Sequence, residues 1–482
     1  MSGRDVGVAA PDLDDRARLP ESTLLLHGLG VTNRAVARAA VAHGRRVLLS
    51  DDGAPAGASE LASEVGAELV LAPSPTDLER LVADADAVVP APGLPESHAL
   101  FSLAEQLGRP VLSEFDLAGA WDDRPVVAIT GTNGKTTVTT LVTSMLERSG
   151  VRAAAVGNLD VPLVEAIARD DLDVFVVEAS SFRLAHSRRF APRVGLWLNF
   201  APDHLDVHRT LDDYRMAKAA IWRDQGDGDV AVVAAEDPVV DSEAEARVER
   251  ARETGVPGPT VVRFGLAAEV GGRPVEYHQE GTTLVGPLTP GGPAVELVDV
   301  GELWRALPHD RTNALAAAAA ALAAGATPDG VRDALRDFRG LPHRVELVGR
   351  AGDVRWYDDS KATAPHATLA ALSGFDSVVL VAGGRNKGLD LGELHRGVDR
   401  VRAVVGIGEA GPEVLAAFED RPGRLAGSMA DAVVAASELA EPGDVVLLSP
   451  GCASFDWYGS YSERGDDFAA RVRELVLDGP PS

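Results

Sequence analysis

Gly131-Thr132-Asn133-Gly134-Lys135-Thr136-Thr137 is the stretch that decides the fold of this chain. An apolar run at 125–130 precedes it and a helical pattern from Val138 to Arg148 follows, so the order is strand, glycine loop, helix. Glycines let successive N–H groups face phosphate oxygens, and the helix N-terminus adds partial positive charge. Lys135 would reach the terminal phosphates, and the Thr136 hydroxyl would ligate Mg²⁺. The strand and helix favour a nucleoside triphosphate site over a glycine-rich turn with a chance lysine.

Lysine is scarce in this chain, because arginine fills nearly every position among its 46 basic residues. A lysine that persists in such a background suggests a need for a compact ammonium group or for an amine that can lose its proton. The scarcity itself fits a GC-rich genome, but the survivors all lie in motif-like stretches. They are Lys135, Lys218, Lys361 and Lys387.

Composition limits the possible functions. The 482 residues predict several domains, and 45% hydrophobic with 25% charged residues is typical of a globular protein. A net charge of −27 argues against a nucleic-acid surface. A single cysteine, Cys452, excludes intrachain disulfides and fits a reducing compartment, and there is no signal-like or membrane-spanning apolar run. We expect a cytoplasmic protein without membrane insertion, acting as a monomer.

The pattern predicts an α/β protein with three domains, each built on a parallel sheet. A flexible tail at 1–20 precedes a Rossmann-like domain at 21–122, in which Gly28-Leu29-Gly30 follows a strand and Asp51 ends the next one. Asn33 stands where a third glycine is usual, so a turn without a ligand remains the alternative.

The central domain, 123–339, carries the phosphate loop between continuous apolar strands. Glu178 ends one of these strands, and a carboxylate beside a phosphate loop is placed to hold Mg²⁺; the alternative is an ordinary exposed acid. Residues 235–300 are rich in Gly, Pro and acids, and we expect surface hairpins there. Helices are expected at 313–324 and 331–338.

A second Rossmann-like domain is expected at 340–482. Three of its strands end in polar stretches, Asp358 to Thr363, Ala382 to Gly388 and Ser449 to Asp456. Because the carboxyl ends of parallel strands share one edge, these stretches should form one crevice, where two lysines would receive an anionic substrate. Taken singly, each lysine would more often be a solvated surface group.

The chain resembles the Mur ligase family over nearly its whole length. The resemblance rests on motifs in order: GTNGKTT, VEASSF, NFAPDHLDVH, YRMAKAAIW, RTNALAA, GLPHR, DDSKAT, AGGRNKG and SPGCASFDWY. It implies three domains, for a UDP moiety, for ATP and for an incoming amino acid. The implied activity is ATP-dependent addition of D-glutamate to UDP-N-acetylmuramoyl-L-alanine through an acyl phosphate, in peptidoglycan precursor synthesis.

The resemblance also implies roles for individual residues. Lys135, Glu178, His204 and Lys218 would be catalytic, and Thr136, Glu178, His204 and a carbamylated Lys218 would support Mg²⁺. ATP would contact Gly131, Thr132, Asn133, Gly134, Lys135, Thr136, Thr137, Asn313, Arg344, Asp359 and Lys361. D-glutamate would be held by Thr363, Lys387, Ser454 and Tyr461. The UDP-substrate would lie near Val31, Thr32, Asp51, Gly93 and Asn158.

Three alternatives remain open. One is a Mur-type ligase that adds another amino acid such as L-glutamate. Another is an enzyme like folylpolyglutamate synthase, which the N-terminal glycine loop disfavours. A third, from another class, is an ATPase switch, which would require neither the C-terminal anion crevice nor Lys218.

Overall fold

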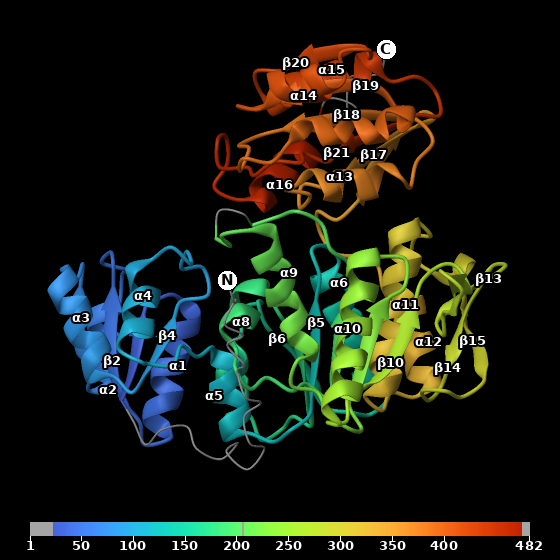
Figure 1. Ribbon diagram of the computed structural model, residues 1–482. Coiled ribbons are helices and arrows are strands. Elements are labelled where there is room, and N and C mark those ends of the chain that lie inside the picture. The colour runs from blue at the N-terminus through green and yellow to red at the C-terminus, as the bar shows by residue number, and fades with distance from the viewer. Residues whose placement is uncertain (1–22, 205–206, 475–482) are drawn as a thin grey trace, which may run out of the picture.

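The computed structural model describes residues 23–204 and 207–474, and its three large sheets follow one another along the chain (Figure 1). This confirms the predicted α/β class. The tail predicted at 1–20 lies outside the described residues. We refer to the sheets and their helices as the N-terminal, central and C-terminal units.

The N-terminal unit has four parallel strands in the order β3-β2-β1-β4. Apolar residues of β1 and β4 are almost completely buried, as expected for strands covered on both faces. Helix α3 begins with a capping box, Ser74 with Asp77, and a proline at its first position. The elements are β1 Thr23–His27, α1 Val31–Ala42, β2 Arg46–Asp51, α2 Ala58–Val65, β3 Glu68–Leu71, α3 Pro75–Asp84, β4 Ala87–Pro90, α4 Ala99–Gln106 and α5 Glu114–Trp121.

The central unit has six parallel strands in the order β10-β9-β8-β5-β7-β6. Strand β5 lies between β8 and β7, so the loop after it opens at the middle of the sheet. The elements are β5 Val126–Thr130, α6 Lys135–Arg148, β6 Ala153–Gly157, α7 Leu163–Ala166, β7 Val174–Glu178, α8 Ser181–His186, β8 Val194–Trp197, α9 Leu211–Ala219, η2 Ala220–Trp222, β9 Val230–Ala234, α10 Pro238–Thr254 and β10 Thr260–Phe264.

The prediction of hairpins throughout 235–300 is wrong for its first part, because α10 occupies Pro238–Thr254. Asp237 caps this helix by accepting from the N–H groups of Val239 and Val240, and Gly255 ends it in the left-handed conformation. Only Val240 and Ala244 of α10 are buried, so the helix leaves almost no apolar stripe in the sequence. Short strands do follow: β11 Glu269–Val270, β12 Arg273–Pro274, β13 His278–Glu280, β14 Thr283–Pro287 and β15 Ala294–Asp299.

Three helices begin earlier than predicted. Helix α6 starts at Lys135, α11 spans Pro308–Ala323 and α12 spans Pro328–Asp337. Proline at the first position starts α11 and α12, because the missing N–H would be unbonded there in any case. Helices α11 and α12 pack on α6 and close the central unit. The short helix η3, Val300–Glu302, precedes them.

The C-terminal unit has six strands in the order β16-β17-β21-β18-β19-β20, all parallel except β16. Strand β21 lies between β17 and β18, so the three polar stretches share one sheet edge, as predicted. The elements are β16 Glu346–Ala351, β17 Val354–Asp358, α13 Pro365–Leu372, β18 Val378–Gly383, η4 Leu391–Arg400, β19 Val401–Ile407, α14 Gly411–Ala417, β20 Gly423–Leu425, α15 Met429–Leu439, β21 Val445–Leu448 and α16 Tyr461–Val472.

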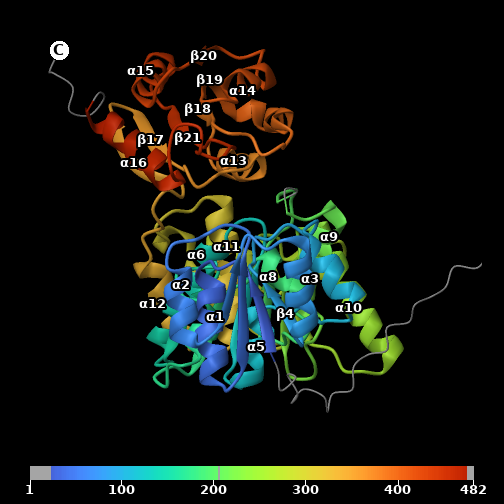
Figure 2. The ribbon, with the colours of Figure 1, turned by 90° about the vertical axis from the view of Figure 1, so that its left-hand side faces the viewer.

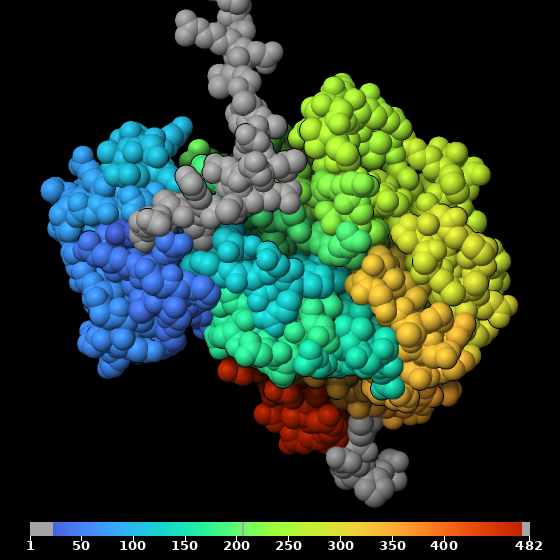
Figure 3. All heavy atoms as spheres, turned by 90° about the horizontal axis from the view of Figure 1, so that it is seen from below, coloured from blue at the N-terminus to red at the C-terminus, as the bar shows by residue number. Residues whose placement is uncertain are grey.

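The three units differ in how far their apolar cores are continuous with one another. One apolar core runs from the N-terminal sheet through α5 into the central sheet, and Figure 3 shows these two units side by side. The C-terminal unit has separate cores on the two faces of its own sheet. It stands above the central unit in Figures 1 and 2. None of the helices at 23–204 and 207–474 is long and apolar enough to cross a membrane.

Candidate active site

The phosphate loop connects β5 to α6 and depends on two glycines with positive φ, Gly131 at 155° and Gly134 at 84°. A Cβ at Gly131 would come within 2.9 Å of Leu198 Cβ, and one at Gly134 within 2.8 Å of Asn313 Oδ1. Both positions therefore require glycine for conformation and for space. Asn313, predicted to meet ATP, lies directly against this loop.

Asn199, which follows β8, fixes the loop from the neighbouring strand. Its Oδ1 accepts from the N–H groups of Thr132 and Asn133 at 3.0 and 2.8 Å, and its Nδ2 donates to Asn133 O at 3.2 Å. The N-terminus of α6 has no side-chain cap. The loop is thus held by Asn199, and no side chain caps the first N–H groups of its helix.

Lys135 folds over its own loop, with Nζ donating to Gly131 O at 2.7 Å and Thr132 O at 3.0 Å. Burial lowers the pKa of this amine. The hydroxyl of Thr136 accepts from Arg344 Nη2 at 2.9 Å, and Thr137 is buried. The loop residues predicted for phosphate binding therefore already meet a cation from the C-terminal unit.

Glu178 ends β7 beside the loop and is 3% exposed. Its Oε1 accepts from Asn158 Nδ2 at 3.1 Å, while Oε2 is buried without a hydrogen-bond partner among the described residues. An uncompensated buried carboxylate oxygen is costly, which is the situation a bound cation relieves. The residue fits the metal role predicted for it.

His204 has a positive φ of 56° and stacks edge-on against Phe182 at 4.8 Å between ring centroids. Burial lowers the pKa of its imidazole to about 4, and the ammonium groups of three lysines add to this effect. The ring is therefore neutral near pH 7, which is the form that ligates metals.

Lys218 lies on α9 and is 1% exposed. Its Nζ donates to Gly131 O at 2.8 Å and lies 4.6 Å from the centre of the Tyr214 ring. Burial, followed by the charge of Lys135, lowers the pKa of this amine well below its usual value. Burial thus makes the neutral amine, the form that can react with CO₂, easier to reach than in an exposed lysine.

Two contacts from the C-terminal side reach the phosphate loop, the Arg344 contact described above and one from His366. His366 Nε2 lies 3.2 Å from Asn133 Oδ1, and the Arg344 contact to Thr136 comes from the segment joining the units. Asp359 is 7% exposed, and burial raises the pKa of its carboxyl group to about 7. Lys361 Nζ lies 3.9 Å from the centre of the Tyr461 ring.

The three polar stretches predicted to form one crevice are joined by backbone hydrogen bonds. Gly451 N–H donates to Ala362 O at 2.9 Å, and Arg385 exchanges two bonds with Ala453. These bonds place Thr363 and Ser454 at one edge, while Lys387 lies exposed on the third stretch. Thr363, Lys387 and Ser454, three of the residues predicted to hold D-glutamate, thus lie at one edge of the C-terminal sheet. The fourth, Tyr461, lies at the start of α16.

Lys135 and Lys218 meet at Gly131 O, and the charges of Lys361 and Lys387 act on groups beside them. The charge of Lys361 acts on Lys135, that of Lys135 acts on Lys218, and those of Lys135, Lys218 and Lys387 all act on His204. Lys135, Lys218 and Lys387 come from different elements of the central and C-terminal units and lie 83 to 252 positions apart in the chain. The contacts place two of the rare amines, those of Lys135 and Lys218, on the phosphate loop, where both donate to Gly131 O.

The N-terminal loop differs from the phosphate loop. Asn33, buried, donates through Nδ2 to the carbonyl groups of His27, Gly28 and Val89 at 3.0–3.1 Å. Asp51 accepts from Leu29 N–H at 2.6 Å and Gly53 N–H at 2.8 Å. Asn33 therefore replaces the missing glycine for a structural reason, because its amide joins β1 to β4.

Sequence reasoning missed Arg183, which joins the N-terminal and central units. Its Nη2 donates to Thr32 Oγ1 at 2.9 Å, its Nη1 to Asn158 Oδ1 at 3.0 Å, and its Nε lies 2.7 Å from Glu114 Oε1. Arg183 and Glu114 are both buried. An arginine in the otherwise uncharged stretch from Ala179 to Ala185 was the available signal.

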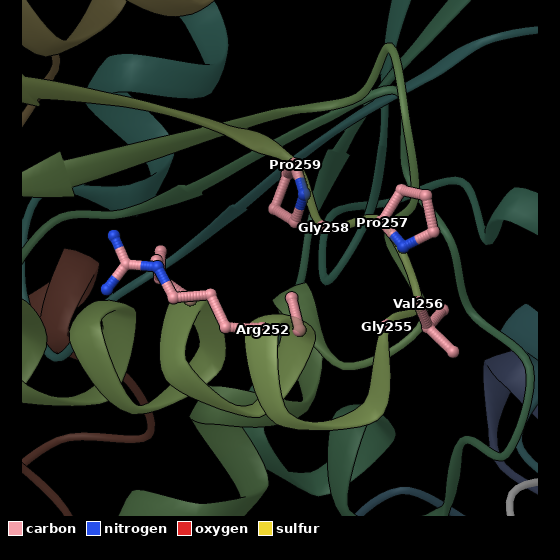
Figure 4. A pocket seen from close by; sticks show the side chains of 8 residues that line it. Arg252, Gly255, Val256, Pro257, Gly258 and Pro259 are labelled. Atoms are coloured by element: carbon pink, nitrogen blue, oxygen red, sulfur yellow. The ribbon is translucent and has the colours of Figure 1, made fainter.

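Arg183 thereby connects residues predicted for the UDP site to Glu178, the carboxylate predicted to hold Mg²⁺, since Asn158 also donates to Glu178. A small cavity lies beside this contact, lined in part by Thr32, Pro92, Phe182 and Arg183. Val31 and Gly93 are exposed near the same sheet edge. A separate hollow of about 330 Å³ lies at the end of α10, around Arg252 and Pro257, and includes none of the predicted site residues (Figure 4).

Comparison with known proteins identifies the class. Residues 129–321 match the Mur ligase middle domain, and residues 343–452 match the Mur ligase, glutamate ligase domain. The chain belongs to the Mur ligase family. A solved structure of MurF from Acinetobacter baumannii has a similar fold, with a TM-score of 0.56 and 18% identity, covering 82% of this chain and 87% of that one.

Within the family, the curated relatives are more specific. The UDP-N-acetylmuramoylalanine–D-glutamate ligase of Desulfosudis oleivorans is 40% identical over 455 residues, covering 93% of this chain and 95% of that protein. The protein of the same name from Frankia casuarinae is 40% identical over 460 residues, covering 93% of each. These relatives match all three units.

Proposed function

We propose that this protein is an ATP-dependent ligase that joins D-glutamate to UDP-N-acetylmuramoyl-L-alanine in peptidoglycan precursor synthesis. The observation that carries the proposal is that Lys135 and Lys218 both donate to Gly131 O of the phosphate loop, while Arg344 and His366 contact the same loop from the C-terminal side. The names of the relatives, which match at 40% identity over most of the chain, supply the two substrates.

In this proposal the phosphate loop positions the triphosphate of ATP. When bound, ATP with Mg²⁺ would supply a phosphoryl group to the substrate carboxylate, leaving ADP and an acyl phosphate; the amine of D-glutamate would then displace inorganic phosphate and lose a proton to give the amide. Lys135 exchanges its bonds to Gly131 O and Thr132 O for bonds to phosphate oxygens. Thr136 and Arg344 face the phosphates together, and Asn313 lies against the loop where the adenosine end would begin.

Glu178 and His204 are the proposed protein ligands of Mg²⁺, with Thr136. The unpartnered Oε2 of Glu178 and the neutral imidazole of His204 fit this role. Carbamylation of Lys218 would replace a buried amine with an anion, and its place beside Gly131 would let that anion support the metal. Arginine at this position could not form the carbamate, which accounts for lysine in an arginine-rich chain.

D-glutamate is proposed to lie at the shared edge of β17, β21 and β18. Lys387 supplies a positive charge there, and the hydroxyl groups of Thr363 and Ser454 supply hydrogen bonds to carboxylate oxygens. Tyr461 closes the site beside Lys361. Asp359 and Lys361 would contact the nucleotide where the C-terminal and central units meet.

The UDP-substrate is proposed to lie across the N-terminal unit, near Val31, Thr32, Asp51 and Gly93, with its amino-acid end toward Asn158. The contact of Asn158 with Glu178 supports this direction, because it leads from the N-terminal loop to the proposed metal site. The proposed domain limits remain 21–122, 123–339 and 340–482. We also propose that the protein is cytoplasmic and monomeric. Sedimentation equilibrium would measure its oligomeric state.

The test is the dependence of ADP formation on both substrates. A ligase releases ADP only when UDP-N-acetylmuramoyl-L-alanine and an amino acid are present together, whereas an ATPase switch releases it without either. A folate substrate that replaced the UDP-substrate would favour the folylpolyglutamate synthase alternative. ADP release unchanged by omission of each substrate would overturn the proposal.

A further inference from the structure

Glu96 lies in the segment after β4 and reaches from the N-terminal unit to the central unit. Its Oε1 lies 2.9 Å from His208 Nδ1, and its backbone O accepts from Arg209 Nη2 at 2.7 Å. Its N–H donates to Val207 O at 3.3 Å, and Oε2 accepts from Arg209 N–H at 3.4 Å. One residue thus makes four contacts with three consecutive residues of another unit.

The far side of the His208 ring meets Ser181. His208 Nε2 lies 2.9 Å from Ser181 Oγ, and both residues are buried. A carboxylate only accepts, so the contact with Glu96 requires a proton on His208 Nδ1, and Nε2 is left to bond with the Ser181 hydroxyl. Glu96, His208 and Ser181 therefore form a hydrogen-bonded line that ends three residues after Glu178. Because the Ser181 hydroxyl is buried, we assign it a structural role in this line of hydrogen bonds and not the role of a nucleophile.

His208 shares its aromatic neighbours with His204, the proposed metal ligand. Phe182 lies 5.6 Å from the His208 ring and 4.8 Å from the His204 ring, and Tyr214 lies 5.3 and 6.1 Å from the two rings. Tyr214 also reaches Thr132 Oγ1 at 3.3 Å and lies under Lys218. A shift of the His208 ring would therefore be transmitted to the metal ligand and to the phosphate loop.

We propose that Glu96 is a positioning residue that couples binding of the UDP-substrate in the N-terminal unit to the geometry of the metal site. Gly93, proposed to contact the UDP-substrate, lies three residues before Glu96 on the same segment. Substrate that orders this segment fixes Glu96, which fixes the His208 ring and, through Phe182 and Tyr214, His204. This inference rests on the proposed function.

The primary test is hydrogen exchange of the His208 amide, which donates to His204 O at 3.1 Å. The full chain is measured without nucleotide or Mg²⁺, with and without UDP-N-acetylmuramoyl-L-alanine. The substrate should slow this exchange about tenfold in the native protein and less than about twofold in Glu96→Ala. Glu105→Ala, an exposed acid of α4 in the same unit, is the matched control and should behave as the native protein.

A kinetic arm separates positioning from general damage. Glu96→Ala should raise the Mg²⁺ concentration for half-maximal rate about tenfold while the KM for ATP stays within about twofold. Glu96→Gln, which keeps an acceptor for His208 Nδ1, should recover most of both effects. Equal protection of the His208 amide in native protein and Glu96→Ala, or an unchanged Mg²⁺ requirement, would overturn the inference. Native protein that does not use D-glutamate would instead overturn the proposed function.

Discussion

The two glycine loops of this molecule, after β1 and after β5, share the order strand, loop, helix but differ in what holds them. Asn199 holds the phosphate loop from the next strand, and Lys135 bonds only to carbonyl groups of the loop itself. In the N-terminal loop, Asn33 and Asp51 are bonded to the loop and its strands. Both loops are therefore held by a side chain from the end of the neighbouring strand, and the N-terminal loop has Asn33 of its own helix in addition. The difference teaches that the glycine pattern by itself does not show which side chains hold such a loop.

The largest effect is expected at Lys218. Lys218→Arg keeps the positive charge but cannot form a carbamate, so kcat should fall about 100-fold while the folded state persists. Steady-state ADP release and circular dichroism measure the two properties. Arg215→Lys on the same helix, where Arg215 pairs with Asp212, is the control. Native turnover in Lys218→Arg would remove the carbamate from the account.

Variants of Asn33 test whether this side chain of α1 holds the N-terminal loop against β1 and β4. Asn33→Ala suits the helix but loses three buried hydrogen bonds, so the apparent free energy of unfolding should fall by about 2 kcal/mol. Asn33→Asp, nearly the same shape, places an acceptor against three carbonyl groups and should be worse. Urea denaturation measures both. Stability equal to the native protein in both variants would show that Asn33 does not hold the loop.

Lys387 tests the crevice of the C-terminal unit. Lys387→Ala should raise the KM for D-glutamate about tenfold, since one charged hydrogen bond is lost, and leave the KM for ATP nearly unchanged. Arg385→Ala, two positions away and paired with Glu409, is the control. An unchanged KM for D-glutamate would mean that this edge is not the amino-acid site.

The smallest effect concerns His186, which stacks on Phe101 between the units. Burial lowers the pKa of His186 to about 4, so it stabilises the fold above its unfolded pKa of about 6.5 and this contribution is lost as pH falls toward 4. Between pH 7 and pH 5.5, His186→Phe should therefore lose about 1 kcal/mol less stability than the native protein. Urea midpoints at the two pH values measure this, and identical losses would contradict it.

The sequence predicted the three-sheet organisation because its strands are continuous apolar runs, as in β5 and β21, which local pattern alone can identify. It missed α10 because only two of that helix's side chains are buried, and it missed the strands β16 and β20, which are exposed over much of their length. An element with few or no buried side chains leaves little periodic signal.

The residues of the candidate site also divide into those that a local sequence pattern predicts and those that it does not. Lys135 and Glu178 could be predicted because a motif or a strand end places them. Arg183 and His366 could not, because their partners Thr32 and Asn133 lie 151 and 233 positions away in the chain. Contacts between units depend on how the sheets are docked, which no local pattern encodes.

The most direct test of the account is an amino-acid panel with UDP-N-acetylmuramoyl-L-alanine and ATP, in which the new amide is detected by mass spectrometry. The account predicts one product, larger than the UDP-substrate by a glutamate residue, formed with D-glutamate together with an equal amount of ADP. Amide formation with L-glutamate and not with D-glutamate would contradict the proposed substrate. ADP release without any amide would contradict the ligase itself.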